Sequence, residues 1–127
     1  MNRLTFAFVI ILLIIASYWL IRKPKIVLSC DSGSALEWAK TFPALYPGKY
    51  NIVLLLHGKC IPAGLNGSKH AESLQKAQKM GVSIKICEKC LLDQGYELKN
   101  LLPGIKPVKY SLHYIAKQHH FDKIIYG

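Results

Sequence analysis

Residues 50–56 read YNIVLLL, a continuous apolar run with the length of a β-strand. Such a run is typical of a strand that is covered on both faces, as in the centre of a parallel sheet. A glycine-containing loop at 58–67 follows, and a helix is predicted over 68–80, ended by Gly81. Residues 82–87 then alternate between apolar and polar side chains, which predicts a strand with one wetter face. The centre of the chain is therefore a strand–helix–strand unit.

The same alternation extends toward the N-terminus of the chain. Residues 26–30 form a short, apolar and partly β-branched segment, which predicts a strand. A helix is predicted over 34–42. Ser34 and Glu37 form an S-x-x-E capping box, which would satisfy free amides at the start of that helix. Pro43 is expected to end it.

Four further elements are predicted after the central unit: a short helix at 88–94, a weak strand at 105–109, a helix at 111–120 and a last strand at 123–126. Strands that alternate with helices predict an α/β fold, here three α/β/α layers around a mainly parallel sheet of about five strands. Right-handed crossovers place the carboxyl ends of the strands along one rim, where such folds build their sites. We assign this domain to residues 26–127.

An apolar segment precedes the domain. Residues 4–21 contain no charged side chain and consist almost entirely of Leu, Ile, Val, Phe and Ala. In a helix this segment extends about 27 Å, close to the thickness of the hydrocarbon core of a bilayer, and Tyr18 and Trp19 stand near one end, where such rings favour the lipid–water boundary. A cleaved secretory signal is the alternative, but the segment is long for a signal and ends in bulky residues. We predict one transmembrane helix within an anchor region of residues 1–25.

The charges that flank this segment predict its orientation. Arg22, Lys23 and Lys25 follow it, whereas Arg3 and the terminal amine precede it. Positive charge beside a membrane helix favours the cytoplasmic side. By a margin of one charge, the sequence predicts that the C-terminal domain lies on the cytoplasmic side of the membrane.

Lysine dominates the charge of the domain. The chain has a formal net charge of +10, and residues 26–127 contain thirteen lysines and no arginine. Nucleic-acid readers depend on arginine for bidentate contacts with bases and phosphates, and no recognition module is apparent, so no nucleic-acid partner is expected. A lysine-coated solvated surface is the simpler interpretation, and attraction to an anionic membrane surface is the alternative.

Three of the four cysteines follow the ends of successive predicted strands. Cys30 closes the first strand, Cys60 lies four residues beyond the second, and Cys87 closes the third, while His57 closes the second strand itself. These side chains should share one edge of a parallel sheet, although their contacts depend on the order of the strands. In an exported domain four cysteines indicate two disulfides; in the cytoplasm they indicate metal or thiol chemistry.

Cys87 has the surroundings that suit a reactive thiol. It lies where a strand passes into a helix, so the free amides and the positive dipole end of the helix should face its sulfur. Lys85 and Lys89 are close in sequence. Both influences lower the pKa of a thiol, and the thiolate is the nucleophile. Cys90 lies one helical turn further on, which completes a C-x-x-C motif that is moderately specific for sulfur or redox chemistry.

Each candidate residue also has a structural interpretation. Cys30 and Cys60 could be small buried hydrophobic residues. His57 could be a structural histidine rather than a proton donor, and the pair at 119–120 is expected to be structural. A zinc site would take His57, Cys60, Cys87 and Cys90 as its ligands. A second closely spaced pair of ligands is missing, so neither a metal nor a cofactor is expected.

The order of four motifs resembles the DsrE/DsrF-like family. They occupy residues 52–58, 81–87, 101–105 and 115–118, and the similarity covers most of the predicted domain. The resemblance implies a compact α/β/α fold, assembled as a trimer or hexamer. It also implies that Cys87 holds sulfane sulfur as a persulfide, because the sulfur-carrying members use a cysteine at that position. The anchor and the second thiol depart from the common pattern.

These observations lead to one main hypothesis and two alternatives. A membrane-anchored sulfur carrier would take sulfane sulfur from a donor protein on Cys87 and pass it to an acceptor protein; any enzymatic activity would be persulfide sulfur transfer. Lys85, Lys89 and the helix start would stabilise the thiolate, and His57 would donate a proton. The first alternative is a non-catalytic, membrane-tethered oligomeric assembly module with inert cysteines. The second is a dithiol oxidoreductase that uses Cys87 and Cys90.

Overall fold

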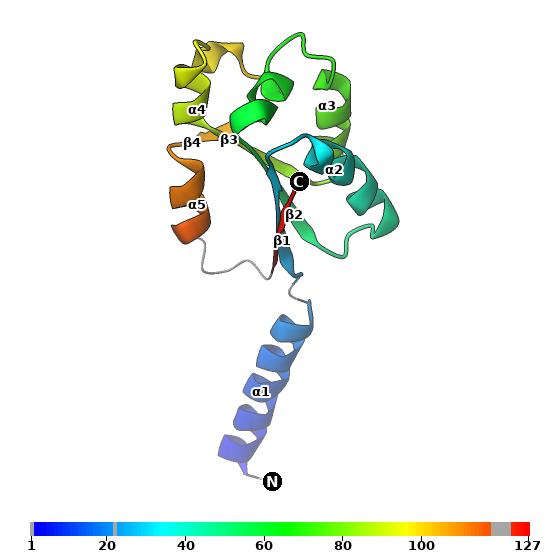
Figure 1. Ribbon diagram of the computed structural model, residues 1–127. Helices are drawn as coiled ribbons and strands as arrows, with labels where there is room; N and C mark the ends of the chain where they lie inside the picture. Colours follow the sequence, from blue (N-terminus) through cyan, green and yellow to red (C-terminus); the bar gives the residue numbers. More distant parts are fainter. Residues whose placement is uncertain (1, 22, 118–122) are drawn as a thin grey trace.

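The computed structural model describes residues 2–21, 23–117 and 123–127, so the predicted helix end at 118–120, with its histidine pair, lies outside the described residues. A single helix leads into a domain in which strands and helices alternate (Figure 1). The elements follow one another in this order: α1 (Arg3–Ile21), β1 (Lys25–Cys30), α2 (Ser34–Leu45), β2 (Asn51–Leu56), the 3₁₀ helix η1 (Gly58–Gly64), α3 (Ala71–Lys79), β3 (Ser83–Cys87), α4 (Glu88–Asp93), the 3₁₀ helix η2 (Leu98–Asn100), β4 (Lys106–Val108), α5 (Ser111–Lys117) and β5 (Lys123–Tyr126).

The five strands form one parallel sheet in the order β4-β3-β2-β1-β5. This confirms the predicted α/β class and the parallel sheet of about five strands. The apolar run at 50–56 forms the central strand β2, which is buried from Ile52 to Leu56. In the register of the sheet, Leu54 lies between Leu28 of β1 and Ile84 of β3.

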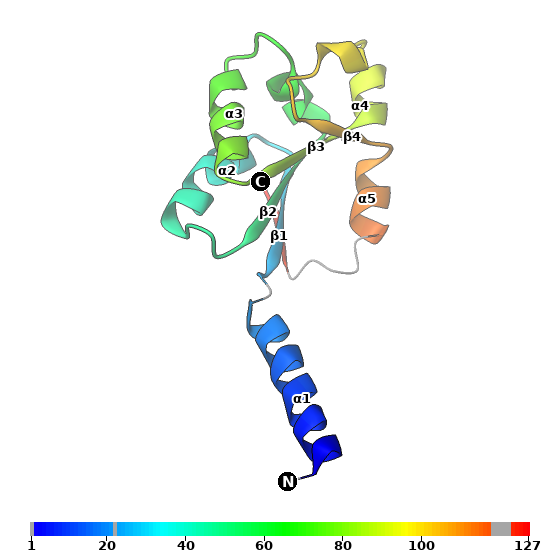
Figure 2. The ribbon, with the colours of Figure 1, turned by 180° about the vertical axis from the view of Figure 1, so that it is seen from behind.

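Helices cover both faces of the sheet, as the predicted three layers require. On one face α2, α3, α4 and η1 pack over a large apolar core that includes Leu28, Leu54 and Ile84. On the other face α5 packs over a smaller core of Val27, Val53 and Leu55 (Figure 2). Burying apolar side chains of both faces is the main stabilising term for such a sheet.

Helix α1 extends away from the domain in both views (Figures 1 and 2). The side chains from Arg3 to Tyr18 are exposed, including Leu4 at 82% and Phe8 at 62%. Among the residues that the structure describes, no helix has both the length and the apolar character needed to cross a membrane. The transmembrane segment predicted at residues 4–21 is therefore not supported.

Two local predictions at α2 were wrong. Pro43 does not end this helix, which continues to Leu45. A proline near the end of a helix removes only one late hydrogen bond, and the Tyr46 N–H still donates to the Phe42 carbonyl at 3.0 Å. The predicted Ser34–Glu37 capping box is also absent, because Gly33 with φ 102° occupies the N-cap position and contributes no side chain.

Candidate functional site

The four cysteines lie at the carboxyl edge of the sheet, where β1, β2 and β3 end side by side. They form two pairs in different chemical states. Cys30 and Cys60 form a disulfide, whereas Cys87 and Cys90 are free thiols. The predicted convergence on one rim is thus present, and it divides into a covalent pair and a thiol pair.

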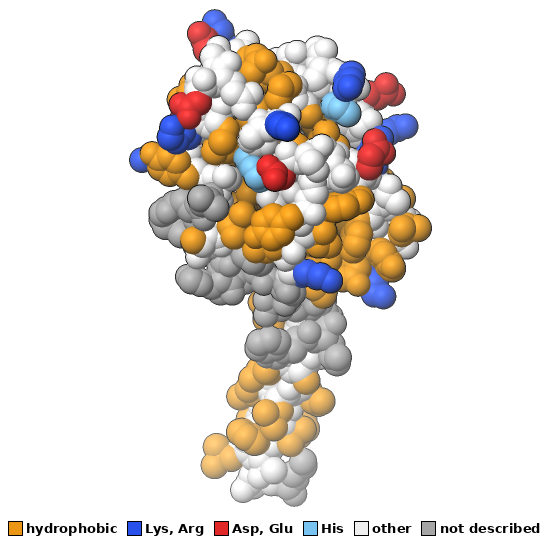
Figure 3. All heavy atoms as spheres, in the orientation of Figure 1, with side chains coloured by type: hydrophobic (Ala, Val, Ile, Leu, Met, Phe, Trp, Pro, Cys, Tyr) orange, Lys and Arg blue, Asp and Glu red, His pale blue; other side chains and the backbone are white. Residues whose placement is uncertain are grey.

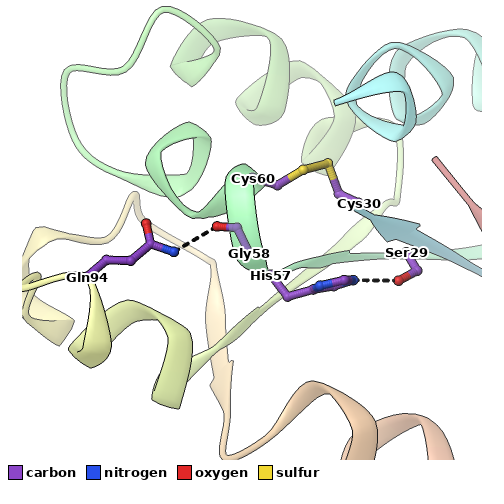
Figure 4. Close-up of a disulfide and its surroundings, with 6 residues drawn as sticks. All are labelled: Ser29, Cys30, His57, Gly58, Cys60 and Gln94. Atoms are coloured by element: carbon purple, nitrogen blue, oxygen red, sulfur yellow. Dashed lines mark hydrogen bonds between the residues drawn. A yellow bond between two sulfur atoms is a disulfide. The ribbon is translucent and has the colours of Figure 1, made fainter. Parts of the chain in front are cut away.

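The disulfide joins the end of β1 to η1 (Figure 4). The Cα atoms of Cys30 and Cys60 are 6.0 Å apart, a normal separation for a disulfide, and both side chains are almost fully buried. A cysteine in a disulfide has no free thiol, so Cys60 is not placed as a catalytic group. The disulfide also removes Cys60 as a ligand of the zinc site considered above. Within the described residues no group of three or more His, Cys, Asp or Glu side chains could hold a metal ion.

His57 bonds to the neighbouring strand. Its Nε2 atom and the Ser29 hydroxyl oxygen share a hydrogen bond of 2.7 Å (Figure 4). Ser29 is fully buried, and a buried hydroxyl without a partner would be costly. The contact therefore gives His57 a structural role and directs Nε2 toward β1.

Cys87 is the last residue of β3 and the N-cap of α4. Its side chain is only 2% exposed. The Cys90 N–H donates to Cys87 Sγ at 3.4 Å, as an N-cap side chain requires. The Cys90 thiol also donates to this sulfur, and so do the amide and the hydroxyl of Ser111 at the start of α5. Two helix starts therefore meet at one sulfur atom.

These contacts favour the ionised form of Cys87. Burial raises the pKa of the Cys87 thiol, but the hydrogen bonds from Cys90 and Ser111 together lower it by more, so the pKa lies below its ordinary value. The helix starts act on the same sulfur through their positive dipole ends. The site thus favours the thiolate form of Cys87, whose sulfur is shielded from solvent and surrounded by donors.

The pKa of Cys90 is shifted in the opposite direction, above its ordinary value. Burial and the hydrogen bond that its thiol donates to Cys87 raise the pKa of Cys90, and the Gly58 N–H, which donates to Cys90 Sγ, lowers it by less. Gly58 also accepts a hydrogen bond of 2.8 Å from the Gln94 side chain through its carbonyl oxygen (Figure 4). Gly58 begins η1, which carries Cys60, so the two cysteine pairs are connected through this segment.

The two predicted lysines do not set the pKa of Cys87. Lys89 Nζ bonds to the Asp93 carboxylate at 2.7 Å, and this hydrogen bond raises the pKa of Lys89. Burial and the neighbouring Lys106 and Lys25 lower the pKa of Lys85. The largest influences on Cys87 are its burial and the donors described above.

A hollow of about 450 Å³ lies between α4, which carries Cys90, and the segment that precedes Ser111. Leu92 on α4 and Tyr110 are both exposed there, at 52% and 44%. The lining of the hollow consists of Glu88, Lys89, Leu92, Asp93, Lys109 and Tyr110.

Two residues of the site were not found from the sequence. Ser111 and Gly58 donate to the two thiols from elements distant in the chain. A serine at the start of the helix predicted over 111–120 is a typical cap, which could have marked Ser111. No local pattern marks Gly58, since its role depends on how η1 packs against α4.

Comparisons with known proteins agree with this fold. MTH1491, a protein of unknown function from Methanobacterium thermoautotrophicum, is similar with a TM-score of 0.73 and 15% identity, over 83% of this chain and 100% of that one. The ychN protein from E. coli is similar with a TM-score of 0.68 and 18% identity, over 84% and 100%. No protein-family model and no curated protein matches the sequence. At this low identity the comparisons show the fold alone, and they agree with the predicted α/β fold.

Proposed function

We propose that this protein carries sulfane sulfur on Cys87. The observation that carries the proposal is the convergence of donors from Cys90 and Ser111 on one sulfur atom that ends the third strand. The lowered pKa of Cys87 supports it, because a thiolate is the attacking species in sulfur transfer. The resemblance of the sequence motifs to the DsrE/DsrF-like family gives the same expectation for Cys87.

The transfer is a balanced thiol exchange. The Cys87 thiolate attacks the terminal sulfur of a donor protein's persulfide; the new S–S bond forms on Cys87 as the donor's S–S bond breaks, and the donor leaves as a thiolate. An acceptor thiolate then takes the terminal sulfur in the same way, and Cys87 leaves as a thiolate. The hydrogen bonds that lower the pKa of Cys87 stabilise it as this leaving group.

Access to Cys87 requires a local opening. The side chain is 2% exposed, and Ser111 at the start of α5 donates hydrogen bonds to it. We place the approach of donor and acceptor at the hollow between α4 and Tyr110, where Leu92 offers an apolar contact. A small shift of the α5 start would uncover the sulfur beside a bound partner.

The proposal can be tested by mass spectrometry of the full chain after treatment with polysulfide. We expect a mass increase of one sulfur atom on Cys87, removed by a thiol acceptor. Cys87→Ser should lose the adduct, and Cys90→Ser should keep it. An adduct of equal yield in Cys87→Ser would contradict the proposal and favour the inert assembly module.

A second candidate function, dithiol chemistry, is favoured by the hydrogen bond from the Cys90 thiol to Cys87 Sγ. Once deprotonated, Cys90 could attack the inner sulfur of a Cys87 persulfide. The Cys87–Cys90 disulfide would form as the outer persulfide sulfur leaves as hydrosulfide; in this step the Cys90 thiol is oxidised and the departing sulfur atom is reduced. A dithiol reductant would restore the pair. Hydrosulfide released by the loaded wild type but not by Cys90→Ser would identify this reaction.

Membrane attachment through α1 is also part of the proposal. Large apolar side chains are exposed on this helix, among them Leu4, Phe6 and Phe8, and exposed apolar surface of this kind requires a cover. Lipid supplies such a cover. We expect the full chain to float with lipid vesicles and to resist extraction by high salt; recovery in the unbound fraction would contradict this.

The disulfide bears on the compartment of the domain. Disulfides persist in oxidising compartments and are rare in the cytoplasm. We therefore propose, against the cytoplasmic placement that the flanking charges predicted, that the domain lies on the oxidising side. Labelling intact cells with a membrane-impermeant thiol reagent, after reduction, should modify Cys30 and Cys60. Labelling only after lysis would favour the cytoplasmic side.

The predicted homo-oligomer stays a prediction. The sulfur-relay resemblance implies a trimer or a hexamer, and the mass of the full chain in detergent micelles, measured by light scattering, would decide between them and a monomer.

A further inference from the structure

The amino edge of the sheet lies next to α1. Only residues 22–24 separate α1 from Lys25, the first residue of β1. The Asn51 N–H donates to the Pro24 carbonyl at 2.9 Å, which ties this connection to the start of β2. The chain therefore enters the sheet at its amino edge, and the edge with the cysteines faces away from α1 (Figure 1).

Apolar and aromatic side chains gather at this amino edge. Leu45 and Tyr46 at the end of α2 are 66% and 42% exposed, and Met80 at the end of α3 is 46% exposed. Tyr46 belongs to a cluster with Phe42 and Tyr50 in which ring centroids lie 5.2 to 5.7 Å apart. A small hollow of about 120 Å³ is lined by Tyr46 and Tyr50 of this cluster, by Met80 and by Lys23, the second residue after α1.

Charge is distributed unevenly between the two edges. Exposed Lys23, Lys49 and Lys79 lie at the amino edge, and Lys49 Nζ lies 5.7 Å from the Tyr46 ring centroid. The acidic residues of the described part lie instead in or beside elements at the carboxyl edge. Figure 3 shows the acidic side chains of one face only in its upper part, away from α1. They are Asp31, Glu37, Glu72, Glu88, Asp93 and Glu97; Asp122 lies outside the described residues.

We propose that this amino-edge surface, formed by Lys23, Leu45, Tyr46, Lys49, Lys79 and Met80, contacts anionic lipid headgroups. The inference rests on the proposed membrane attachment of α1 and adds an orientation to it. Tyrosine and exposed apolar side chains suit the lipid–water boundary, and lysines beside a membrane helix are attracted to anionic lipid. A protein partner would not explain why the surface adjoins the exposed apolar helix. The domain then sits on the lipid with Cys87 directed toward soluble donors and acceptors.

Hydrogen–deuterium exchange of the full chain tests this orientation. The protein is bound to vesicles of phosphatidylcholine alone or of phosphatidylcholine with phosphatidylglycerol. We expect slower amide exchange at 45–50 and 79–82 in the anionic vesicles only. Each lysine should shift the equilibrium between the lipid-bound and the free state of this surface by about fivefold. The double substitution Lys49→Gln and Lys79→Gln should therefore remove the protection.

A matched control removes the same charge at the other edge. The double substitution Lys69→Gln and Lys99→Gln should leave the protection unchanged, since both side chains are exposed at the carboxyl edge. Equal exchange in the two vesicle types would overturn the inference while flotation still supports attachment. Protection in detergent that grows with protein concentration would assign the surface to a second copy instead. Failure to float would overturn both proposals.

Discussion

Two cysteine pairs lie at one rim of the sheet, but they differ in sequence separation and in bonding. Cys30 and Cys60 are separated by 30 residues, join β1 to η1 and are covalently bonded. Cys87 and Cys90 are one helical turn apart and stay free, with hydrogen bonds between them. The first pair closes a long loop, whereas the second closes none and contributes only the cap at the start of α4.

This difference separates stability from chemistry. A bond that closes a long loop stabilises mainly by restricting the unfolded chain, so the first pair should matter for folding. A free pair with unequal pKa values is suited to thiol exchange, so the second should matter for reactivity. Gly58 is the point of contact between them, because it starts the segment that carries Cys60 and donates to Cys90.

The largest expected effect is the loss of the disulfide. The double substitution Cys30→Ala and Cys60→Ala should lower the free energy of unfolding by about 3–4 kcal/mol, the loop-closure term for a separation of 30 residues. Urea denaturation measures this. Cys90→Ser is the control and should change stability far less. Four titratable thiols in the unreduced, denatured wild type would show that the disulfide is absent.

The second prediction concerns the donor from α5. Ser111→Ala removes one hydrogen bond to Cys87 and should move the pKa of this thiol upward. A thiol with a lowered pKa keeps its reactivity as the pH falls until the pH passes that pKa, so the alkylation profile of Cys87 should shift to higher pH. We expect about a fivefold slower reaction at neutral pH, as for one hydrogen bond of about 1 kcal/mol.

Ser68→Ala is the matched control for this experiment, since the Ser68 hydroxyl donates to the Ala63 carbonyl at 2.8 Å and does not contribute to the thiol pair. Its profile should coincide with the wild type. Loss of the Ser111 hydroxyl could also expose the sulfur and so change the rate of alkylation. The pH midpoint of the profile is therefore the quantity that reports the pKa of Cys87. An unchanged midpoint would show that Ser111 does not lower this pKa.

A smaller effect on stability is expected from substitution of Gly58, which connects the two cysteine pairs. Gly58 has φ +54°, a left-handed conformation that costs a side-chain-bearing residue about 1 kcal/mol. Gly58→Ala should lower the free energy of unfolding by that amount and, by displacing its N–H from Cys90, raise the pKa of Cys90. Gly67→Ala, at φ +80°, should cost similar stability without changing Cys90. Identical alkylation profiles in both variants would show that Gly58 does not connect the disulfide to the thiol pair.

The comparison also shows which features a sequence pattern carries. The apolar run at 50–56 predicted the central strand, and the strand ends at Cys30 and Cys87 were predicted correctly. These features are local, because hydrophobic periodicity and glycine positions determine them. The C-x-x-C motif at Cys87 is local too, so the thiol pair could be found.

Contacts between distant elements could not be predicted. The Cys30–Cys60 bond depends on where η1 returns over β1, and the Ser111 donor depends on β4 placing α5 beside Cys87. Neighbouring charge in the sequence was a misleading substitute for this information. Lys89 was expected to stabilise the thiolate, but its side chain bonds to Asp93 one turn along α4.

The smallest effect is therefore expected for the lysine. Lys89→Gln should leave the alkylation profile of Cys87 unchanged, because the donors from Cys90 and Ser111 outweigh any charge on α4. The ion pair with Asp93 is exposed, and exposed pairs contribute little to stability, so the denaturation midpoint should also stay constant. Asp93→Asn is the informative partner: it releases the Lys89 ammonium from its bond. If the Cys87 profile moves to lower pH in that variant and returns in the double variant, the lysine acts on the thiolate through space. If neither variant moves it, the site depends on hydrogen bonds rather than on charge.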